Sequence, residues 1–125
     1  MNIDLLLSMV KDSLDDELLK PEYRKMPDRH PVTGHCYIAS EAVFHLMGGK
    51  DVVKAFCGRD SDGCTHWWLE EKSSGLIIDP TSEQYTFFSE DPPYENGKPC
   101  GFLTKTPSKR CQIVIDRVKE KMKNV

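Results

Sequence analysis

Three residues of the sequence have side chains suited to acyl transfer, and they occur in the order Cys36, His66, Asp79. A cysteine thiolate attacks a carbonyl carbon, an imidazole within hydrogen-bond reach carries the proton, and a carboxylate holds the imidazole in the required tautomer. A helix cysteine, a strand histidine and an aspartate in the next strand rarely occur in this order by chance. The three residues therefore predict a Cys-His-Asp catalytic triad.

The element that carries the cysteine is predicted to be a helix from about Cys36 to Leu46, which follows a loop and ends at Gly48 and Gly49. The first N–H groups of a helix have no partner within it, and the positive end of the helix dipole lies there. Both effects favour a thiolate over a thiol. The position of Cys36 in the predicted helix is therefore suited to a nucleophile.

A predicted antiparallel hairpin brings the histidine and the carboxylate together. Residues 65–69 and 75–79 have the composition of strands and are separated by a turn. If the turn is centred just after Lys72, His66 faces Asp79 directly across the ladder. A slip of one residue would instead place the two side chains on opposite faces of the sheet.

The remaining elements form the frame around this hairpin. Apolar residues recur at steps of three and four from Asn2 to about Lys20, which predicts an amphipathic helix that Pro21 helps to end. A second amphipathic helix should start at Pro107 or Ser108. Its predicted buried stripe consists of Cys111, Val114, Ile115 and Val118.

Between the two terminal helices, a strand is predicted over residues 52–57, a short helical turn within residues 82–88, and a solvated loop over residues 89–98. We therefore expect a single α+β domain over residues 1–125. A small antiparallel sheet should pack against the central helix that carries Cys36, with the amphipathic helices at the N-terminal and C-terminal ends.

Attack on a carbonyl also needs hydrogen-bond donors for the oxyanion that forms. The backbone N–H of Cys36 is expected to supply the first. The second could come from the side chain of His35, from the amide of Gln84, or from an indole N–H such as that of Trp67. The sequence does not choose among these three.

Several stretches of the chain also carry a family resemblance: GHCYIASEAVFHLMGG, HWWL, GLIIDPTSEQY and GFLTKTPSKR. Over roughly residues 30–112 they are similar to a set of small, mostly uncharacterised bacterial and bacteriophage proteins. From Cys36 to Asp79 the order of residues resembles the papain-like superfamily in its transglutaminase-like and NlpC-like branches. There, a cysteine opens a helix that packs on an antiparallel sheet bearing the histidine and then the aspartate.

This resemblance implies a papain-like core with Cys36 as nucleophile, His66 as general base and acid, and Asp79 as the orienting group. It also implies a location in a bacterial cell or a phage-infected host. Unlike the papain-like peptidases, the chain has no clear glutamine upstream of Cys36. The resemblance implies no particular substrate.

A zinc site is the main alternative for the same part of the chain. The residues with zinc-binding atoms are His35, Cys36, Cys57, Cys64 and His66. None of them forms the closely spaced pairs that structural zinc sites use. We therefore expect no metal ion and no other cofactor.

The cysteines are expected to be reduced. Their number, five, is odd, and Cys57, Cys64, Cys100 and Cys111 are predicted to be small apolar residues of the core or surface. Free thiols rather than disulfides are typical of a reducing compartment. The first residues match neither a signal peptide nor a membrane span, so a cytoplasmic location without membrane attachment is expected.

Composition restricts the partners as well. The net charge of −3 makes nucleic acid an improbable partner, although basic residues gather in the C-terminal helix. The leading hypothesis is a cysteine-dependent acyl-transfer enzyme acting on a protein or peptide-like amide, thus a peptidase, isopeptidase, deamidase or transglutaminase-like protein. The alternative is a non-catalytic binding protein on the same fold, with a role in phage-host interaction or counter-defence.

Overall fold

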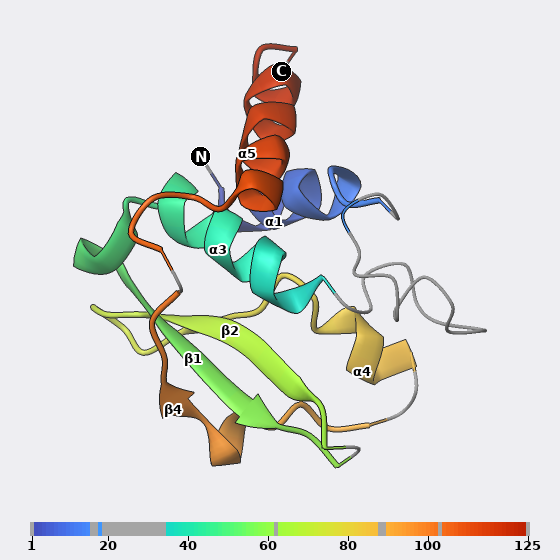
Figure 1. Cartoon of the computed structure of the whole chain (residues 1–125), viewed down its shortest axis with the longest axis vertical. Helices are drawn as coiled ribbons and strands as arrows, with labels where there is room; N and C mark the ends of the chain where they lie inside the picture. Colours follow the sequence, from blue (N-terminus) through green and yellow to red (C-terminus); the bar gives the residue numbers. More distant parts are fainter. Residues whose placement is uncertain are drawn as a thin grey trace.

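The computed structural model of the chain describes residues 2–15, 18, 35–61, 63–87, 90–102 and 104–124, and Figure 1 shows their arrangement. The elements in chain order, with η marking a one-turn helix, are α1 (Ile3–Asp12), α3 (Cys36–Leu46), η2 (Gly49–Asp51), β1 (Val53–Arg59), β2 (Thr65–Glu71), β3 (Ile77–Ile78), α4 (Glu83–Phe87), η3 (Tyr94–Asn96), β4 (Lys98–Pro99) and α5 (Lys109–Met122). Helices and a small antiparallel sheet are thus combined, as expected for the α+β class.

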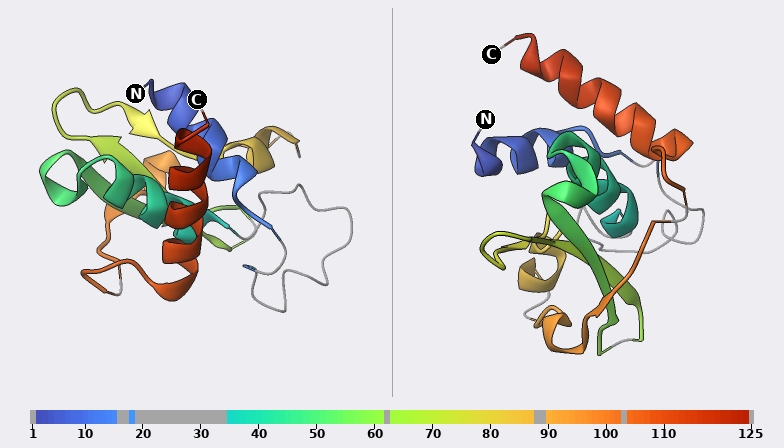
Figure 2. Two further views of the ribbon diagram at one scale, coloured as in Figure 1. Left: turned by 90° about the horizontal axis from the view of Figure 1, so that it is seen from above. Right: turned by 90° about the vertical axis from the view of Figure 1, so that its left-hand side faces the viewer.

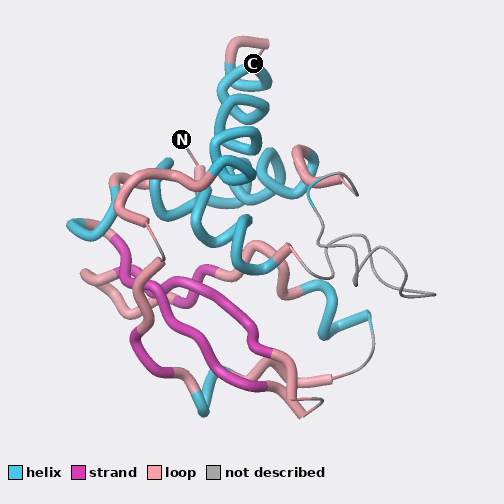
Figure 3. The backbone as a smooth tube through the Cα atoms, in the orientation of Figure 1, coloured by secondary structure: helices cyan, strands magenta, loops and turns pink. Residues whose placement is uncertain are grey.

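The strands of the described residues lie in the order β3-β2-β1-β4, and neighbouring strands are antiparallel. The central hairpin of β1 and β2 is the long part of the sheet, and it pairs from Val53 with Glu71 to Arg59 with Thr65. Figure 3 shows this hairpin as the two long magenta segments. The short outer strands leave one edge of β2 open beside His66, because β3 pairs only with Leu69 and Glu70.

The helices α1, α3 and α5 form two layers over one face of the sheet. α3 packs against β1 and β2, and α1 and α5 pack on the other side of α3, as the two views of Figure 2 show. Buried apolar side chains fill the space between these layers; they include Val10, Ala39, Val43, Leu69, Val114 and Val118. α3 is therefore the central helix, as predicted.

The C-terminal helix begins and packs as the sequence predicts. Ser108 is the N-cap of α5, and its hydroxyl accepts a hydrogen bond from the N–H of Cys111. The buried stripe is the predicted one: Cys111, Val114, Ile115 and Val118. The buried carboxylate of Glu41 on α3 accepts hydrogen bonds from the N–H and the hydroxyl of Ser108, at 2.9 and 2.8 Å. These two bonds join the start of α5 to α3.

The N-terminal helix is shorter than predicted, because α1 ends at Asp12 rather than near Lys20. At the next residue, the Ser13 hydroxyl donates to the carbonyl of Met9, and the Ser13 carbonyl accepts from the guanidinium of Arg117. This tertiary bond uses a carbonyl that a longer helix would need for its own ladder. The predicted surface crossing over residues 21–31 lies outside the described residues.

The hairpin that carries the histidine also differs from the prediction. Leu69 pairs with Ile78 and Glu70 with Ile77, so the register is shifted by two residues from the predicted one. The turn is longer than expected, and it ends at Gly75, whose φ of 75° is in the left-handed region that favours glycine. A shift of two residues keeps every side chain on its predicted face, because side chains alternate with period two.

The segment after α4 is more ordered than the predicted solvated loop. β4 lies within it and pairs with the end of β1, and Cys57 forms a disulfide bond with Cys100. The expectation that all the cysteines are reduced is therefore wrong. The N–H of Cys100 donates to the carbonyl of Ala55, and the two cysteine Cα atoms lie 5.9 Å apart, within the usual range for a disulfide.

The other cysteines remain free thiols: Cys36 is half-buried, Cys64 is exposed and Cys111 is buried. Among the described residues, no helix combines the length and the apolar character needed to cross a membrane.

Candidate active site

The nucleophile candidate lies where the sequence places it, at the first residue of α3. The Cys36 thiol points to the carbonyl of Thr65, with 3.7 Å between sulfur and oxygen. One helical turn later, the Ser40 hydroxyl donates to the carbonyl of Trp67 at 3.1 Å. Residues four apart on a helix and two apart on a strand have similar spacing, so both contacts form at once. They hold the start of α3 along the open edge of β2.

The side chain of His66 is almost completely buried, with 1% of it exposed. Its Nε2 lies 2.6 Å from Oδ2 of Asp79, and its Nδ1 lies 3.3 Å from the amide nitrogen of Gln84. A carboxylate can only accept, so Nε2 carries a hydrogen and donates it to Asp79. Nδ1 is the nitrogen that remains for a reacting partner.

The environment of His66 raises its affinity for a proton. Burial by itself would lower the pKa of His66, but hydrogen bonds with Asp79 and Cys36, and the charges of both, raise that pKa to about 9. His66 is therefore an imidazolium at neutral pH, and its Nδ1–H bonds to the Cys36 sulfur, because the NH2 group of Gln84 is itself a donor and cannot accept. One N–H is held by Asp79, and the Cys36 sulfur is a partner for the imidazolium charge.

The carboxylate of Asp79 is also buried, with 3% of its side chain exposed. Its Oδ1 accepts from the backbone N–H of Thr81 at 3.0 Å, directly after Pro80. Its Oδ2 accepts from His66 and also from the hydroxyl of Tyr94, at 2.8 Å. With these partners, the buried charge is paired and hydrogen-bonded.

Three aromatic residues that the sequence did not indicate as site residues surround the histidine. Trp68 stacks beside the imidazole with ring centroids 5.8 Å apart, and the ring of Tyr85 meets it edge-on at 4.8 Å. The Tyr85 hydroxyl donates to Asp60. Tyr94 reaches the site through Asp79. Only Trp68 had a sequence signal, its position two residues from His66 on one face of a strand.

The three candidates for oxyanion and substrate binding lie in different places. Gln84, on α4, is beside Nδ1 of His66. His35 is the N-cap of α3 and is completely buried. Trp67 lies on the opposite face of β2 from His66 and packs against Tyr37 at 4.9 Å. Of the three, Gln84 is the side chain that the fold brings to the histidine.

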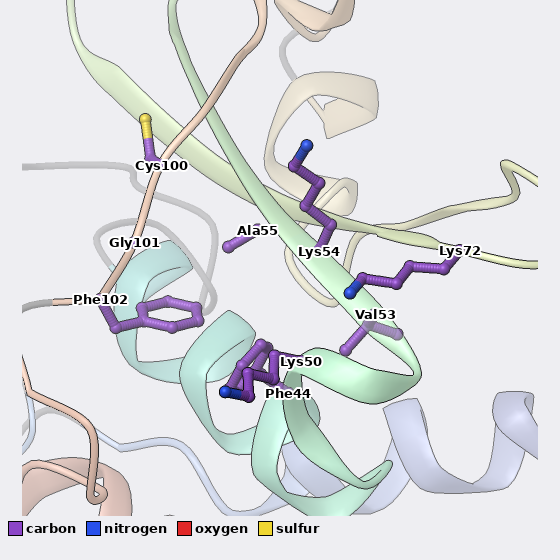
Figure 4. Close-up of a pocket in the computed structure, with 9 residues that line it drawn as sticks. All are labelled: Phe44, Lys50, Val53, Lys54, Ala55, Lys72, Cys100, Gly101 and Phe102. Atoms are coloured by element: carbon purple, nitrogen blue, oxygen red, sulfur yellow. The ribbon is translucent and has the colours of Figure 1, made fainter.

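A cavity of about 340 Å³ lies beside the C-terminal half of α3, at the end of the helix away from Cys36. Figure 4 shows its lining, in which Phe44 and Phe102 form an apolar wall. The ammonium groups of Lys50, Lys54 and Lys72 point in different directions around it. They do not converge on one position where an anion would bind.

Within the part of the chain that the structure describes, no group of three or more His, Cys, Asp and Glu side chains could hold a metal ion. Comparison of the chain with protein-family models, with curated proteins and with solved structures finds no significant match. The case for a function therefore depends on the geometry around Cys36, His66 and Asp79.

Proposed function

We propose that this chain is a cysteine-dependent enzyme that transfers the acyl group of an amide, and that its helix and sheet form a papain-like core. Cys36 is the nucleophile, His66 the general acid and base, and Asp79 the group that orients His66. One observation carries this proposal. His66 is bound at Nε2 by a buried carboxylate, while the thiol at the start of α3 contributes to its raised pKa.

In the first half of the reaction, the Cys36 sulfur attacks the amide carbonyl carbon and a C–S bond forms. The electron pair of the carbonyl moves to oxygen. As the tetrahedral intermediate collapses, the C–N bond breaks, and the His66 imidazolium gives its Nδ1 proton to the leaving nitrogen. The products are a free amine and a thioester on Cys36, with His66 now neutral.

In the second half, neutral His66 takes a proton from the acceptor, water or an amine, as the acceptor attacks the thioester. The C–S bond then breaks, and the thiolate-imidazolium pair returns. Asp79 keeps its hydrogen bond to Nε2 throughout. These two half-reactions account for hydrolysis and for acyl transfer to an amine with the same three residues.

The oxyanion has two donors in this proposal. The backbone N–H of Cys36 is one of the first N–H groups of α3, which have no partner within the helix. The second is the side-chain amide of Gln84, which lies beside the imidazole. A protein or peptide-like amide is the substrate class that this arrangement suits.

The test is the rate at which the thiols react with iodoacetamide at neutral pH, with each labelled site mapped by mass spectrometry. Cys36 should react at least tenfold faster than Cys64, which is the exposed free thiol and serves as the reference. His66→Ala should remove this difference. His45→Ala, at the other end of α3, should not.

A Cys36 that reacts no faster than Cys64 in the folded protein contradicts the proposal. Iodoacetamide reports on the thiolate alone and not on acyl transfer. If Cys36 does react faster than Cys64, the next step is a screen of amide substrates with the Cys36→Ala variant as the blank.

A further inference from the structure

Tyr94 contacts the site from η3, an element that contains none of the triad residues. Its hydroxyl donates to Oδ2 of Asp79 at 2.8 Å, and the same oxygen accepts from Nε2 of His66 at 2.6 Å. The two donors therefore compete for the electron density of one oxygen atom. Removal of the Tyr94 hydroxyl should therefore change the strength of the hydrogen bond between Asp79 and His66.

The ring of Tyr94 is held in place on several sides. It packs edge-on against Trp68, with centroids 5.1 Å apart, and Trp68 in turn stacks on His66. Gly97 allows the chain to pass close to Trp68, because a Cβ at that position would lie 2.4 Å from the indole Cζ2. The close packing of this segment on Trp68 fixes where the Tyr94 hydroxyl points.

The same segment is also fastened to β1. β4 pairs Pro99 with Phe56 and Lys98 with Cys57, and the disulfide joins Cys57 to Cys100. The ladder and the covalent bond therefore both hold the chain immediately after η3, which begins at Tyr94. A segment attached in this way can keep one hydroxyl in one position relative to a buried carboxylate.

The hydroxyl of Tyr94 remains a donor over the whole working range of pH. Burial, followed by the negative charge and the hydrogen bond of Asp79, raises the pKa of Tyr94 well above its ordinary value. A phenol that stays protonated can only stabilise the ionised form of its carboxylate partner. Its hydrogen bond takes up part of the negative charge on Oδ2 of Asp79 that His66 would otherwise receive alone.

We propose that Tyr94 is a positioning residue for the reacting pair: by sharing Oδ2 of Asp79, it fixes the carboxylate and limits how strongly Asp79 holds the imidazolium of His66. This inference rests on the proposed function, since it concerns the acid-base group of the same site. Its role is to keep His66 able to release its proton to a leaving amine.

The test must distinguish the effect of Tyr94 on His66 from the effects of the groups that contact His66 directly. The titratable ones are Cys36 on α3, Asp79 after β3, and Tyr85 on α4, whose ring contacts the imidazole. Tyr94 acts on His66 through Asp79. Tyr85 provides a matched control, because its hydroxyl also donates to a carboxylate, at 2.9 Å, but that carboxylate belongs to Asp60.

The experiment is a pH titration of the His66 ring nitrogens by NMR in the whole protein. The His66 signals are identified by their loss in His66→Gln. Tyr94→Phe keeps the ring and removes the competing donor, so the pKa of His66 should rise by about one unit, as expected for the loss of one charge-assisted hydrogen bond. In Tyr85→Phe the pKa of His66 should change by no more than about a tenth of the shift expected in Tyr94→Phe.

Equal shifts in the two variants, or none in Tyr94→Phe, would overturn the proposal. If Tyr94→Phe does not fold, 3-fluorotyrosine is incorporated into the Tyr85→Phe protein, where the more acidic phenol of residue 94 is a stronger donor. The pKa of His66 should then fall, and an unchanged pKa would overturn the proposal. The titration does not require Cys36 to react, so it can succeed where the alkylation test of the proposed function fails, and the reverse.

Discussion

The hydroxyl of Ser40 donates a hydrogen bond to the carbonyl of Trp67, which belongs to the residue directly after His66 in β2. Ser40 is one helical turn from Cys36, so this bond determines the position of the thiol along β2. The nucleophile and the imidazole are therefore aligned by a contact of their neighbours. That contact, together with the hydrogen bond between His66 and Asp79, leads to the predictions that follow.

Removal of the Ser40 hydroxyl should loosen the start of α3. In Ser40→Ala the carbonyl of Trp67 loses its partner in a buried position, so the free energy of unfolding should fall by about 1–2 kcal/mol. The rate of Cys36 alkylation should fall about tenfold if the bond aligns the thiol, a loss of about 1.4 kcal/mol. Urea unfolding and iodoacetamide kinetics measure the two effects.

Ser8→Ala, on an exposed position of α1, is the control and should change neither quantity. A Ser40→Ala protein that loses stability but keeps its alkylation rate would show that the bond supports the fold without placing the thiol.

The raised pKa of His66 makes the stability of the fold depend on pH. His66 has a pKa of about 9 in the folded chain against 6.5 without the fold's contacts. A histidine whose pKa is raised by folding stabilises the native state fully below the lower value, and this stabilisation is lost as pH rises through the higher one. The free energy of unfolding should therefore fall by about 3 kcal/mol between pH 6 and pH 9.5.

Asp79→Asn removes the charge that contributes most to this raised pKa. Urea unfolding at both pH values should show that the dependence is reduced in this variant, where Cys36 still raises the pKa of His66, and lost in His66→Gln. Persistence of the full pH dependence in His66→Gln would assign it to another group.

Gln84 should act on acyl transfer and not on the thiol itself. Alkylation by iodoacetamide forms no oxyanion, whereas acylation by an activated ester such as p-nitrophenyl acetate does. Gln84→Ala should thus slow acylation of Cys36 by about 100-fold, the usual effect of losing one oxyanion donor, and leave alkylation almost unchanged. Release of p-nitrophenol under single-turnover conditions gives the acylation rate.

Gln112→Ala, on the exposed face of α5, provides the comparison. If Gln84→Ala slows both reactions equally, Gln84 positions His66 and is not an oxyanion donor.

The disulfide should stabilise the chain by restricting its unfolded state. Cys57 and Cys100 are separated by 43 residues, and closing a loop of that length accounts for about 4 kcal/mol in the chain-entropy model. Cys57→Ser should lower the free energy of unfolding by up to this amount, and Cys64→Ser should not change it. Thiol counting on protein unfolded without reductant checks the bond itself, since more than three reactive thiols would contradict it.

Elements with local signals could be predicted from the sequence. The helix from Cys36 to Leu46 has the predicted bounds, because Gly48, with a φ of 116°, follows it. The buried stripe of α5 follows from helical periodicity, which is a property of adjacent turns. The end of α1 was missed, because Arg117, far away in the sequence, takes the carbonyl of Ser13.

The pairing of His66 with Asp79 was predicted although the register was wrong. The face of a strand on which a side chain lies depends only on whether its position is odd or even, so an error of two residues does not matter. The turn length was decided by Gly75 and the hydrogen bonds around it. The sequence thus determined which residues share a face, and the fold determined how far apart they are along the strands.

The contacts of Tyr94 and the Cys57–Cys100 disulfide were decided by the tertiary structure alone. Both depend on the pairing of β4 with β1, which are separated by about forty residues. A two-residue strand is too short to show a hydrophobic periodicity from which it could be predicted. The sequence by itself determined the types and the local placement of Cys36, His66 and Asp79. Only the tertiary structure decided what surrounds them, because burial and hydrogen bonding between distant segments exist only when the whole chain is folded.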